Sequence, residues 1–327
     1  MSKKIAIITD SHFGIRKDNP VILDKLETFL QKTFFPVIDK LKIDTVGHIG
    51  DVFDKRKGVD FRTLDQSKRM FFEPLKEREL DVFAVIGNHD TYYTNTNSTN
   101  SVNILAKDYG WSIIDKPCTV PIKGVPVCLI PWITSESKDA SEQEIQKTKA
   151  DILLGHLEIQ GFQITKGHPS LKGMTSDLFK KFAFVGSGHF HIKSSNGNIH
   201  FFGTPGQFTW DDYKEPKGFH IFDLETKKLD FISNKIETFK KLIYTGPDSI
   251  IEDVKDCYVK IMVEGKSDPV ELDNFIKAIE SRKPVDIKVI DNKRLNIQKI
   301  EEDEQMEDAG FAAGAARRTS RTEHQPY

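Results

Sequence analysis

Five short apolar segments in this sequence are each followed at once by carboxylate, amide or imidazole side chains. Residues 82–86 (VFAVI) lead into Gly87-Asn88-His89-Asp90. An apolar run of five residues that ends at a glycine predicts a buried strand, and ligands of α/β sheets bind at the carboxyl ends of the strands. The other junctions follow residues 5–9, 45–49, 152–155 and 184–188. We therefore expect five strand ends to build one polar site.

The side chains at these junctions are the oxygen and nitrogen donors of a metal site. The candidate ligands are the carboxylates of Asp10 and Asp51, the amide of Asn88, and the imidazoles of His12, His156, His189 and His191. Such donors without a thiolate suit manganese, iron or zinc better than calcium or magnesium. The set is too large for one tetrahedral ion, so it predicts two divalent cations roughly 3.5–4 Å apart, which act on phosphoesters. For each residue alone, a strand-end cap or a turn is the alternative.

Composition limits the class of protein. A formal net charge of −2 over 327 residues gives no overall positive field, so a polyanion would have to be bound by local basic patches. Cys118, Cys128 and Cys257 are odd in number and lack CxxC spacing, which predicts inert thiols in a reducing compartment. No apolar stretch approaches the length of a membrane span, and the amino terminus runs directly into a strand-like segment. We therefore expect a cytoplasmic protein with no membrane partner.

The order of the expected elements predicts two domains and a tail. Helices are expected over residues 21–42, with Pro36 as a break or kink, and over residues 61–78; strands dominate residues 151–231. This order predicts a layered α/β domain over residues 1–236. Residues 237–298 predict a small α/β unit with an amphipathic helix near residues 269–281. Residues 299–327 have no apolar period and predict a disordered tail.

The junction motifs, taken in order, resemble a known family. Asp10-x-His12, Gly50-Asp51-x-x-Asp54, Gly87-Asn88-His89-Asp90, Gly155-His156 and Gly188-His189-x-His191 resemble the signature of the calcineurin-like metallophosphoesterases. Ile130-Pro131-Trp132 and Gly203-Thr204-Pro205 extend the similarity to the SbcD-type DNA nucleases, including the recombination nuclease subunits of T-even-like phages. The resemblance covers roughly residues 4–235. It implies a four-layer α-β-β-α sandwich followed by a small carboxyl-terminal α/β domain that caps DNA.

The resemblance also implies a role for each junction residue. One manganese ion would lie on Asp10, His12, Asp51 and His191, and the second on Asp51, Asn88, His156 and His189, so that Asp51 bridges the two. His89 would be the catalytic imidazole that stabilises the transition state or protonates the leaving 3′ oxygen. Asp90 would orient His89 through a hydrogen bond. We expect Asp54 to support a turn or a ligand rather than to bind metal itself.

Charged and aromatic residues beside the junctions predict contact with DNA. The candidates are Arg16, Lys17, Lys55, Arg56 and Lys57 for the phosphate backbone, and Tyr92 and Tyr93 for stacking on a base or wedging a strand end. Solvated charge and loop packing are the alternatives. The resemblance implies a homodimer through residues 21–35 and 61–72 and an SbcC-like coiled-coil ATPase as partner. Family members usually dock that ATPase through a carboxyl-terminal amphipathic helix, which residues 299–327 do not offer.

Together these features predict a metal-dependent phosphodiester hydrolase. By resemblance it would be a 3′-to-5′ exonuclease on duplex ends and a single-strand endonuclease in DNA repair and recombination, located in the host cytoplasm if a phage encodes it. The first alternative is another phosphoesterase, such as a protein phosphatase or a cyclic-nucleotide phosphodiesterase. Phosphoprotein phosphatases typically have Glu where Asp90 stands, which disfavours that alternative. A non-catalytic scaffold for DNA ends is the second alternative.

Overall fold

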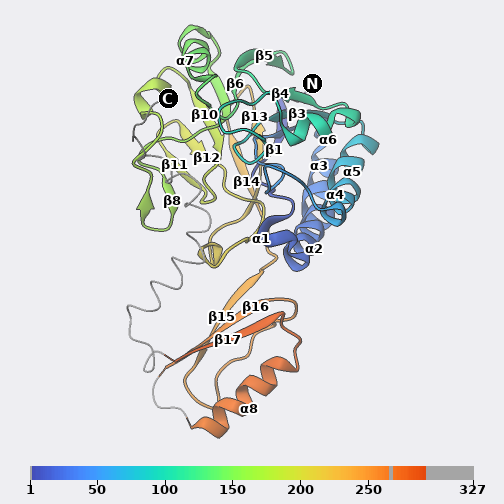
Figure 1. Ribbon diagram of the computed structural model, residues 1–327, viewed down its shortest axis with the longest axis vertical. Coiled ribbons are helices and arrows are strands. Elements are labelled where there is room, and N and C mark those ends of the chain that lie inside the picture. Colours follow the sequence, from blue (N-terminus) through green and yellow to red (C-terminus); the bar gives the residue numbers. More distant parts are fainter. Residues whose placement is uncertain (1, 265–267, 292–327) are drawn as a thin grey trace, which may run out of the picture. The chain divides into compact units, whose positions relative to one another are not determined.

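The computed structural model describes residues 2–264 and 268–291 (Figure 1). The described residues divide between two compact units, and the change falls between Phe239 and Lys240. The predicted tail over residues 299–327 lies outside the described residues. The role of the second unit as a DNA cap stays a prediction.

The first sheet of the first unit has the order β14-β13-β1-β2-β3-β4. Its parallel strands are β1 (Lys4–Ile8), β2 (Thr45–His48), β3 (Asp81–Val85) and β4 (Ser112–Ile114), while β13 (Gly218–Asp223) runs antiparallel to β1 and β14 (Leu229–Ser233) antiparallel to β13. The late strand β13 is thus inserted beside β1. The parallel strands all deliver their carboxyl ends to one edge.

The second sheet has the order β11-β12-β10-β7-β6-β5. Its strands are β5 (Cys118–Ile122), β6 (Val125–Ile130), β7 (Ile152–His156), β10 (Phe184–Gly188), β11 (Ser194–Asn196) and β12 (Ile199–Phe201). The four inner strands are parallel, and each outer strand forms an antiparallel pair with its neighbour. A two-stranded hairpin of β8 (Gln163–Thr165) and β9 (His168–Pro169) stands apart from this sheet.

Two long helical stretches belong to the first sheet. The first runs through α2 (Pro20–Phe29), η1 (Leu30–Phe34) and α3 (Phe35–Leu41), and the second through α4 (Phe61–Ser67), η2 (Lys68–Phe72) and α5 (Glu73–Glu77). Asn19 and Asp60 cap their amino termini. A proline lies just after each π-helical segment, and the wider turn lets the helix continue although proline has no N–H. Pro36 therefore does not end the helix, so of the expected break or kink the break is wrong.

Three separate hydrophobic clusters define the layers of the first unit. On β1, Ala6 and Ile8 face the cluster that contains Leu26 and Phe71 of the helices, whereas Ile5 and Ile7 face the second sheet. The third cluster joins the outer side of the second sheet to Ile145 of α7 (Lys138–Lys147). Shorter elements complete the surface: α1 (Ile15–Asp18), α6 (Ser101–Leu105), η3 (Lys107–Tyr109), η4 (Ser176–Phe179) and η5 (Trp210–Asp212). The predicted α/β sandwich of four layers is confirmed.

The second unit is a three-stranded sheet with one helix. Its order is β15-β16-β17, with β15 (Phe239–Tyr244), β16 (Tyr258–Val263), α8 (Pro269–Glu280) and β17 (Asp286–Asp291). Phe275 and Ile279 of α8 share a buried cluster with Leu242, Val259 and Ile261 of the sheet. This unit therefore has a core of its own.

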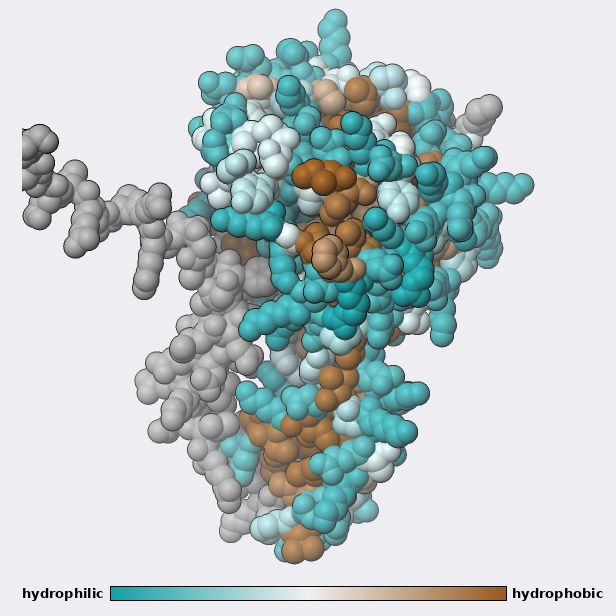
Figure 2. Space-filling view, turned by 45° about the vertical axis from the view of Figure 1, so that its right-hand side comes forward, coloured by the Kyte–Doolittle hydropathy of each residue, from teal (hydrophilic) through white to brown (hydrophobic). Residues whose placement is uncertain are grey.

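The surface in view is largely hydrophilic and carries separate hydrophobic patches (Figure 2). Within residues 2–264 and 268–291, no helix combines the length and the apolarity needed to cross a bilayer.

Candidate metal centre

The polar junctions of the two sheets meet at one place in the first unit. Asp10 and Asp51 follow β1 and β2, and His156 ends β7 of the other sheet. Each of these three residues exposes at most 1% of its surface to solvent. The facing carboxyl edges of two sheets thus bring together residues that are far apart in the sequence, as the strand-end pattern predicts.

One group of donors forms around His12. Its Nε2 lies 3.1 Å from Nε2 of His191, 3.6 Å from Oδ2 of Asp51 and 3.9 Å from Oδ1 of Asp10. One donor atom from each of Asp10, His12 and His191 lies within 4.8 Å of the others. The structure therefore gathers all four residues predicted for the first cation.

A second group forms around Asn88. Its Oδ1 lies 3.0 Å from Nε2 of His156 and 2.9 Å from Nδ1 of His189. Oδ2 of Asp51 lies 3.4 Å from the same His156 nitrogen and 3.6 Å from Nε2 of His12. One carboxylate oxygen of Asp51 is therefore within 3.6 Å of a donor nitrogen in each group.

The tautomers of the histidines fit cation binding. Nδ1 of His156 donates to the carbonyl oxygen of Ile49 at 2.8 Å, because a carbonyl can only accept. When the ring is neutral, its Nε2 turns a lone pair toward Asp51 and Asn88, which also present acceptors. Metal-binding histidines usually donate their other ring nitrogen in this way. In that neutral state the site holds acceptor atoms with no donor between them, and a divalent cation can bind to all of them.

Electrostatics point in the same direction. Burial disfavours a charged His12, but the nearby carboxylates of Asp54 and Asp51 outweigh it and raise the pKa of His12 to about 9. Burial is likewise outweighed at His156, where the charge of Asp51 raises the pKa to about 9. Burial and the neighbouring His156 lower the pKa of His189 to about 3. The buried carboxylates thus favour positive charge close to them, and either protons on the histidines or bound cations can supply it.

Asp54 contacts His12 from the side away from the other donors. Its Oδ1 lies 3.4 Å from Nδ1 of His12, a long contact for a hydrogen bond. Both atoms are buried and have no closer hydrogen-bonding partner among the described residues. This placement favours support of a ligand over direct metal binding, as the sequence led us to expect.

Asp90 has a different place from the one predicted. Its carboxylate accepts from the backbone N–H groups of Asp51 at 2.8 Å, Val52 at 2.9 Å and Gly87 at 2.9 Å. The His89 ring instead has its Nδ1 2.6 Å from the backbone carbonyl oxygen of Asp54. Asp90 therefore joins the loops after β2 and β3, and the predicted hydrogen bond from Asp90 to the His89 ring is corrected. Side-chain spacing could not foresee this, since the partners are backbone groups.

The strand-end loops are tightly constrained. Asp10, His12, Asp51 and His189 have positive φ angles of 50°, 42°, 54° and 85°. Non-glycine residues adopt such angles at a cost, typically at functional sites where the surroundings enforce them. The strain is consistent with a site that is built for ligand placement.

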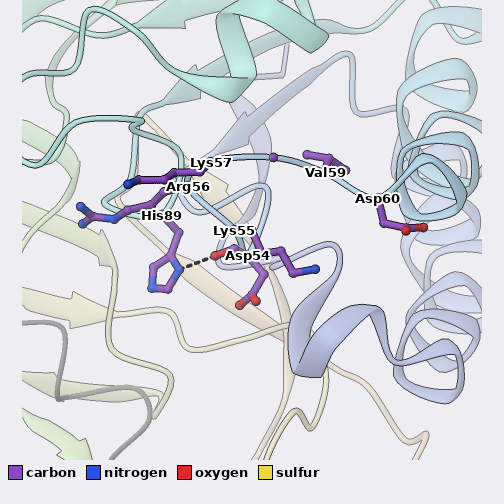
Figure 3. A pocket seen from close by; sticks show the side chains of 8 residues that line it. Asp54, Lys55, Arg56, Lys57, Val59, Asp60 and His89 are labelled. Carbon is purple, nitrogen blue, oxygen red and sulfur yellow. Dashed lines mark hydrogen bonds between the residues drawn. The ribbon is translucent and has the colours of Figure 1, made fainter.

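His89 opens onto a hollow of about 730 Å³ lined by residues 54–60. Arg56 and Lys57 extend to the same side as the His89 ring, whereas Lys55 extends the other way (Figure 3). Lys57 Nζ lies 5.8 Å from the centre of the Tyr92 ring. The structure thus brings Arg56 and Lys57 into the same hollow as the predicted catalytic imidazole, with Tyr92 near Lys57. Tyr93 packs edge-on against Tyr92 and is 52% exposed.

The remaining predicted basic residues lie on the α1 side of the loop. Arg16 and Lys17 are exposed and occupy a left-handed turn, with φ near 60° at both and at Asp18. Lys55 forms an ion pair with Asp18, whose other oxygen accepts from Thr63 at 2.9 Å. Lys55 is therefore held in an ion pair within the protein, while Arg16 and Lys17 face solvent.

Sequence reasoning missed several neighbours of the donors. Trp132 packs on His189 with ring centres 4.9 Å apart, and its position directly after a buried strand was a usable signal. Ser11 Oγ lies 2.8 Å from Nε2 of His48, a histidine that no motif contains. Lys217 reaches the carbonyl oxygen of His191 at 2.8 Å. No local pattern indicates the last two contacts.

Comparison with known proteins adds independent information. Residues 3–193 match the family model described as calcineurin-like phosphoesterase. Exonuclease subunit 1 of Enterobacteria phage T4 is 30% identical over 284 residues, which cover 85% of this chain and 80% of that protein. The SbcD subunit of the nuclease SbcCD from Staphylococcus epidermidis is 21% identical over 262 residues, 69% of this chain and 67% of that protein. A solved archaeal phosphodiesterase is 16% identical, covers 71% of this chain and 99% of its own, and has a TM-score of 0.36, too low to support an argument.

Proposed function

Because this chain belongs to the calcineurin-like phosphoesterase family, we propose that it hydrolyses phosphodiester bonds of DNA with the help of two divalent cations. The observation that carries the proposal is the position of the Asp51 Oδ2 atom, which lies within 3.6 Å of a donor nitrogen both in the group around His12 and in the group around Asn88. The family and the nuclease names of the two relatives confirm the predicted class of enzyme, a phosphodiester hydrolase. The resemblance and the oxygen and nitrogen donors without thiolate support manganese as the metal.

The cations would be held as the resemblance implies. Asp10, His12, Asp51 and His191 would bind one, and Asp51, Asn88, His156 and His189 the other. When bound, such a pair supplies a nucleophile at neutral pH and offsets the charge that grows on the phosphoryl oxygens. Asp54 and the carbonyl of Ile49 would hold His12 and His156 in place.

His89 is the proposed proton carrier. Its Nδ1 donates to the Asp54 carbonyl oxygen, so Nε2 is the nitrogen that gains or loses a proton. A protonated ring would stabilise negative charge on the phosphoryl group or protonate the leaving 3′ oxygen. Asp90 would act on catalysis through the backbone of the Asp51 loop rather than through His89.

Arg56 and Lys57 are the proposed contacts to the phosphate backbone, and Tyr92 is the proposed contact to a base. Arg56 and Lys57 line the hollow on the His89 side, and the Tyr92 ring lies near Lys57. Arg16 and Lys17 would contact backbone farther along. Such contacts would hold a DNA strand beside the donors. The proposed 3′-to-5′ exonuclease and single-strand endonuclease activities in DNA repair and recombination rest on the resemblance.

The proposed partners rest on the relatives. Both relatives are named as subunits, which supports an SbcC-like ATPase as a partner of this chain. We also propose a homodimer through residues 21–35 and 61–72 and a place in the cytoplasm, that of the host if a phage encodes the chain. Phe61, 88% exposed at the start of α4, offers a hydrophobic side chain that a second copy would cover.

The test is cleavage of end-labelled duplex and single-stranded DNA by the purified chain with manganese. His89→Ala should abolish release of label yet bind manganese as the parent does, as measured by calorimetry. His168→Ala changes an exposed histidine of the β8–β9 hairpin and should leave cleavage intact.

Two results would contradict the proposal. Equal release by the parent and His89→Ala would remove His89 from the chemistry. Hydrolysis of a small phosphoester with no cleavage of DNA would favour another phosphoesterase, and binding of DNA ends without any hydrolysis would favour the scaffold.

A further inference from the structure

A buried lysine outside every motif contacts the loop of a proposed metal ligand. Lys217 is 3% exposed, and its ammonium group donates to the backbone carbonyl oxygen of His191 at 2.8 Å. The same ammonium group forms an ion pair with Asp212, which is also 3% exposed. A buried lysine is costly unless it is paired and hydrogen-bonded, and both conditions are met here.

Asp212 is itself held in place. Its Oδ2 accepts from the backbone N–H groups of Phe208 at 2.7 Å and Thr209 at 2.9 Å. Its backbone carbonyl accepts from Nε2 of the buried Gln207 at 3.2 Å, and Oε1 of Gln207 accepts from the backbone N–H of Thr238 at 2.8 Å. We call Gln207, Asp212 and Lys217 the brace. The brace joins the ligand-bearing loop to a segment much farther along the chain.

The segment fixed by Asp212 also touches two proposed ligands. The buried ring of Phe208 lies edge-on to His12 and His191, with ring centres 6.1 Å and 6.3 Å apart. Gly203 packs closely on the His191 loop, since a Cβ there would lie 3.0 Å from the His191 carbonyl oxygen. The backbone of His191 is thus held by Lys217 while its ring is confined by Phe208.

We propose that Lys217 is a positioning residue for His191, and that the brace sets the affinity of the cation site to which His191 belongs. A buried ion pair by itself is weak evidence of a stabilising role, because replacing such a pair by apolar side chains often leaves a protein equally stable or more stable. Groups that orient a metal ligand, in contrast, typically change metal affinity by about 10–100-fold when removed. The inference rests on the proposed metal centre but does not need the DNA substrate.

The experiment compares manganese binding by calorimetry among folded variants of the full chain. Lys217→Met should weaken one of the two binding events at least tenfold and leave the other unchanged. Lys217→Arg keeps the charge and the donor and should restore affinity to near that of the parent. The matched control is Lys123→Met, which breaks the Lys123–Asp44 ion pair away from the donors and should bind manganese normally.

A second variant keeps the test decisive if Lys217→Met does not fold. Asp212→Asn retains an acceptor for Phe208 and Thr209 but removes the charge beside Lys217, and it should weaken the same binding event. Parental affinity in either folded variant would overturn the proposal, and so would unfolding of both, since the pair would then serve folding alone. A parent that binds manganese but does not cut DNA would refute the proposed function and leave this inference standing.

Discussion

Substitution of Gly50 by alanine tests how tightly the loop after β2 of the first sheet packs against His156, a proposed metal ligand from the second sheet. Gly50 has φ of +95°, and a Cβ there would lie 2.2 Å from Nδ1 of His156 and 3.0 Å from Cα of Gly87. The His156 ring is fully buried and donates to the Ile49 carbonyl at 2.8 Å, so it cannot retreat without losing that bond. We expect the variant to displace the ring.

The expected loss of stability follows from these contacts. A left-handed alanine costs about 1–2 kcal/mol. Overpacking adds about 1–3 kcal/mol, and the lost hydrogen bond about 1 kcal/mol. We expect Gly50→Ala to lower the free energy of unfolding by about 3–6 kcal/mol. Gly161→Ala is the matched control, because φ is +86° there and a Cβ would meet no atom within 4 Å. That control should lose only about 1–2 kcal/mol.

The assay is urea unfolding of the metal-free chain followed by tryptophan fluorescence. Trp111, Trp132 and Trp210 all belong to the first unit, so the signal reports that unit alone. Calorimetry should also show weaker manganese binding in Gly50→Ala and normal binding in Gly161→Ala. Equal destabilisation of the two variants would refute the reasoning, because the contact with His156 would then cost nothing.

Three further outcomes are expected. The double variant Arg16→Gly/Lys17→Gly should keep or gain up to about 1 kcal/mol of stability, because glycine relieves the left-handed turn, while DNA affinity and its salt dependence both fall. Burial lowers the pKa of His220 to about 3, so the contribution of this residue to stability is complete above pH 6.5 and is lost as the pH falls below that value. The loss should reach about 2 kcal/mol at pH 5. His220→Phe should flatten this pH dependence of the free energy of unfolding, as measured in urea. Chelation should lower the melting temperature of the chain, and manganese at 100 times its Kd should restore about 2.7 kcal/mol per site, whereas no change on chelation would argue against bound cations.

Much of the site could be predicted because parallel strands share an edge. Asp10, Asp51 and His156 follow buried apolar runs, so their convergence follows from the class of fold without knowledge of the pairing order. The pattern also predicted the alternation of strands and helices in the first half of the chain. These features are local in sequence and therefore visible there.

The rest depends on contacts that local patterns do not contain. Asp90 accepts hydrogen bonds from backbone N–H groups of another loop. Nearly every residue has a backbone N–H group, so the sequence does not indicate which of them a carboxylate will contact. Lys217 stands in the stretch Lys-Glu-Pro-Lys, which is typical of an exposed turn, yet the fold buries it against His191. Pro36 predicted a break or a kink in the helix, and the π-helical turn before it lets the helix continue without a break. In each case tertiary structure decides between options that the sequence leaves open.

The place of β13 beside β1 has a consequence for synthesis of the chain. Strand β1 acquires one of its two neighbours only when residues 218–223 have emerged from the ribosome. By then every proposed metal ligand has already been made. The nascent chain therefore carries all of these metal-binding side chains while its central strand still has an open edge. Fragments that end near residue 200 should neither fold nor bind cations in an ordered way, and co-translational assembly of the centre has to wait for this late strand.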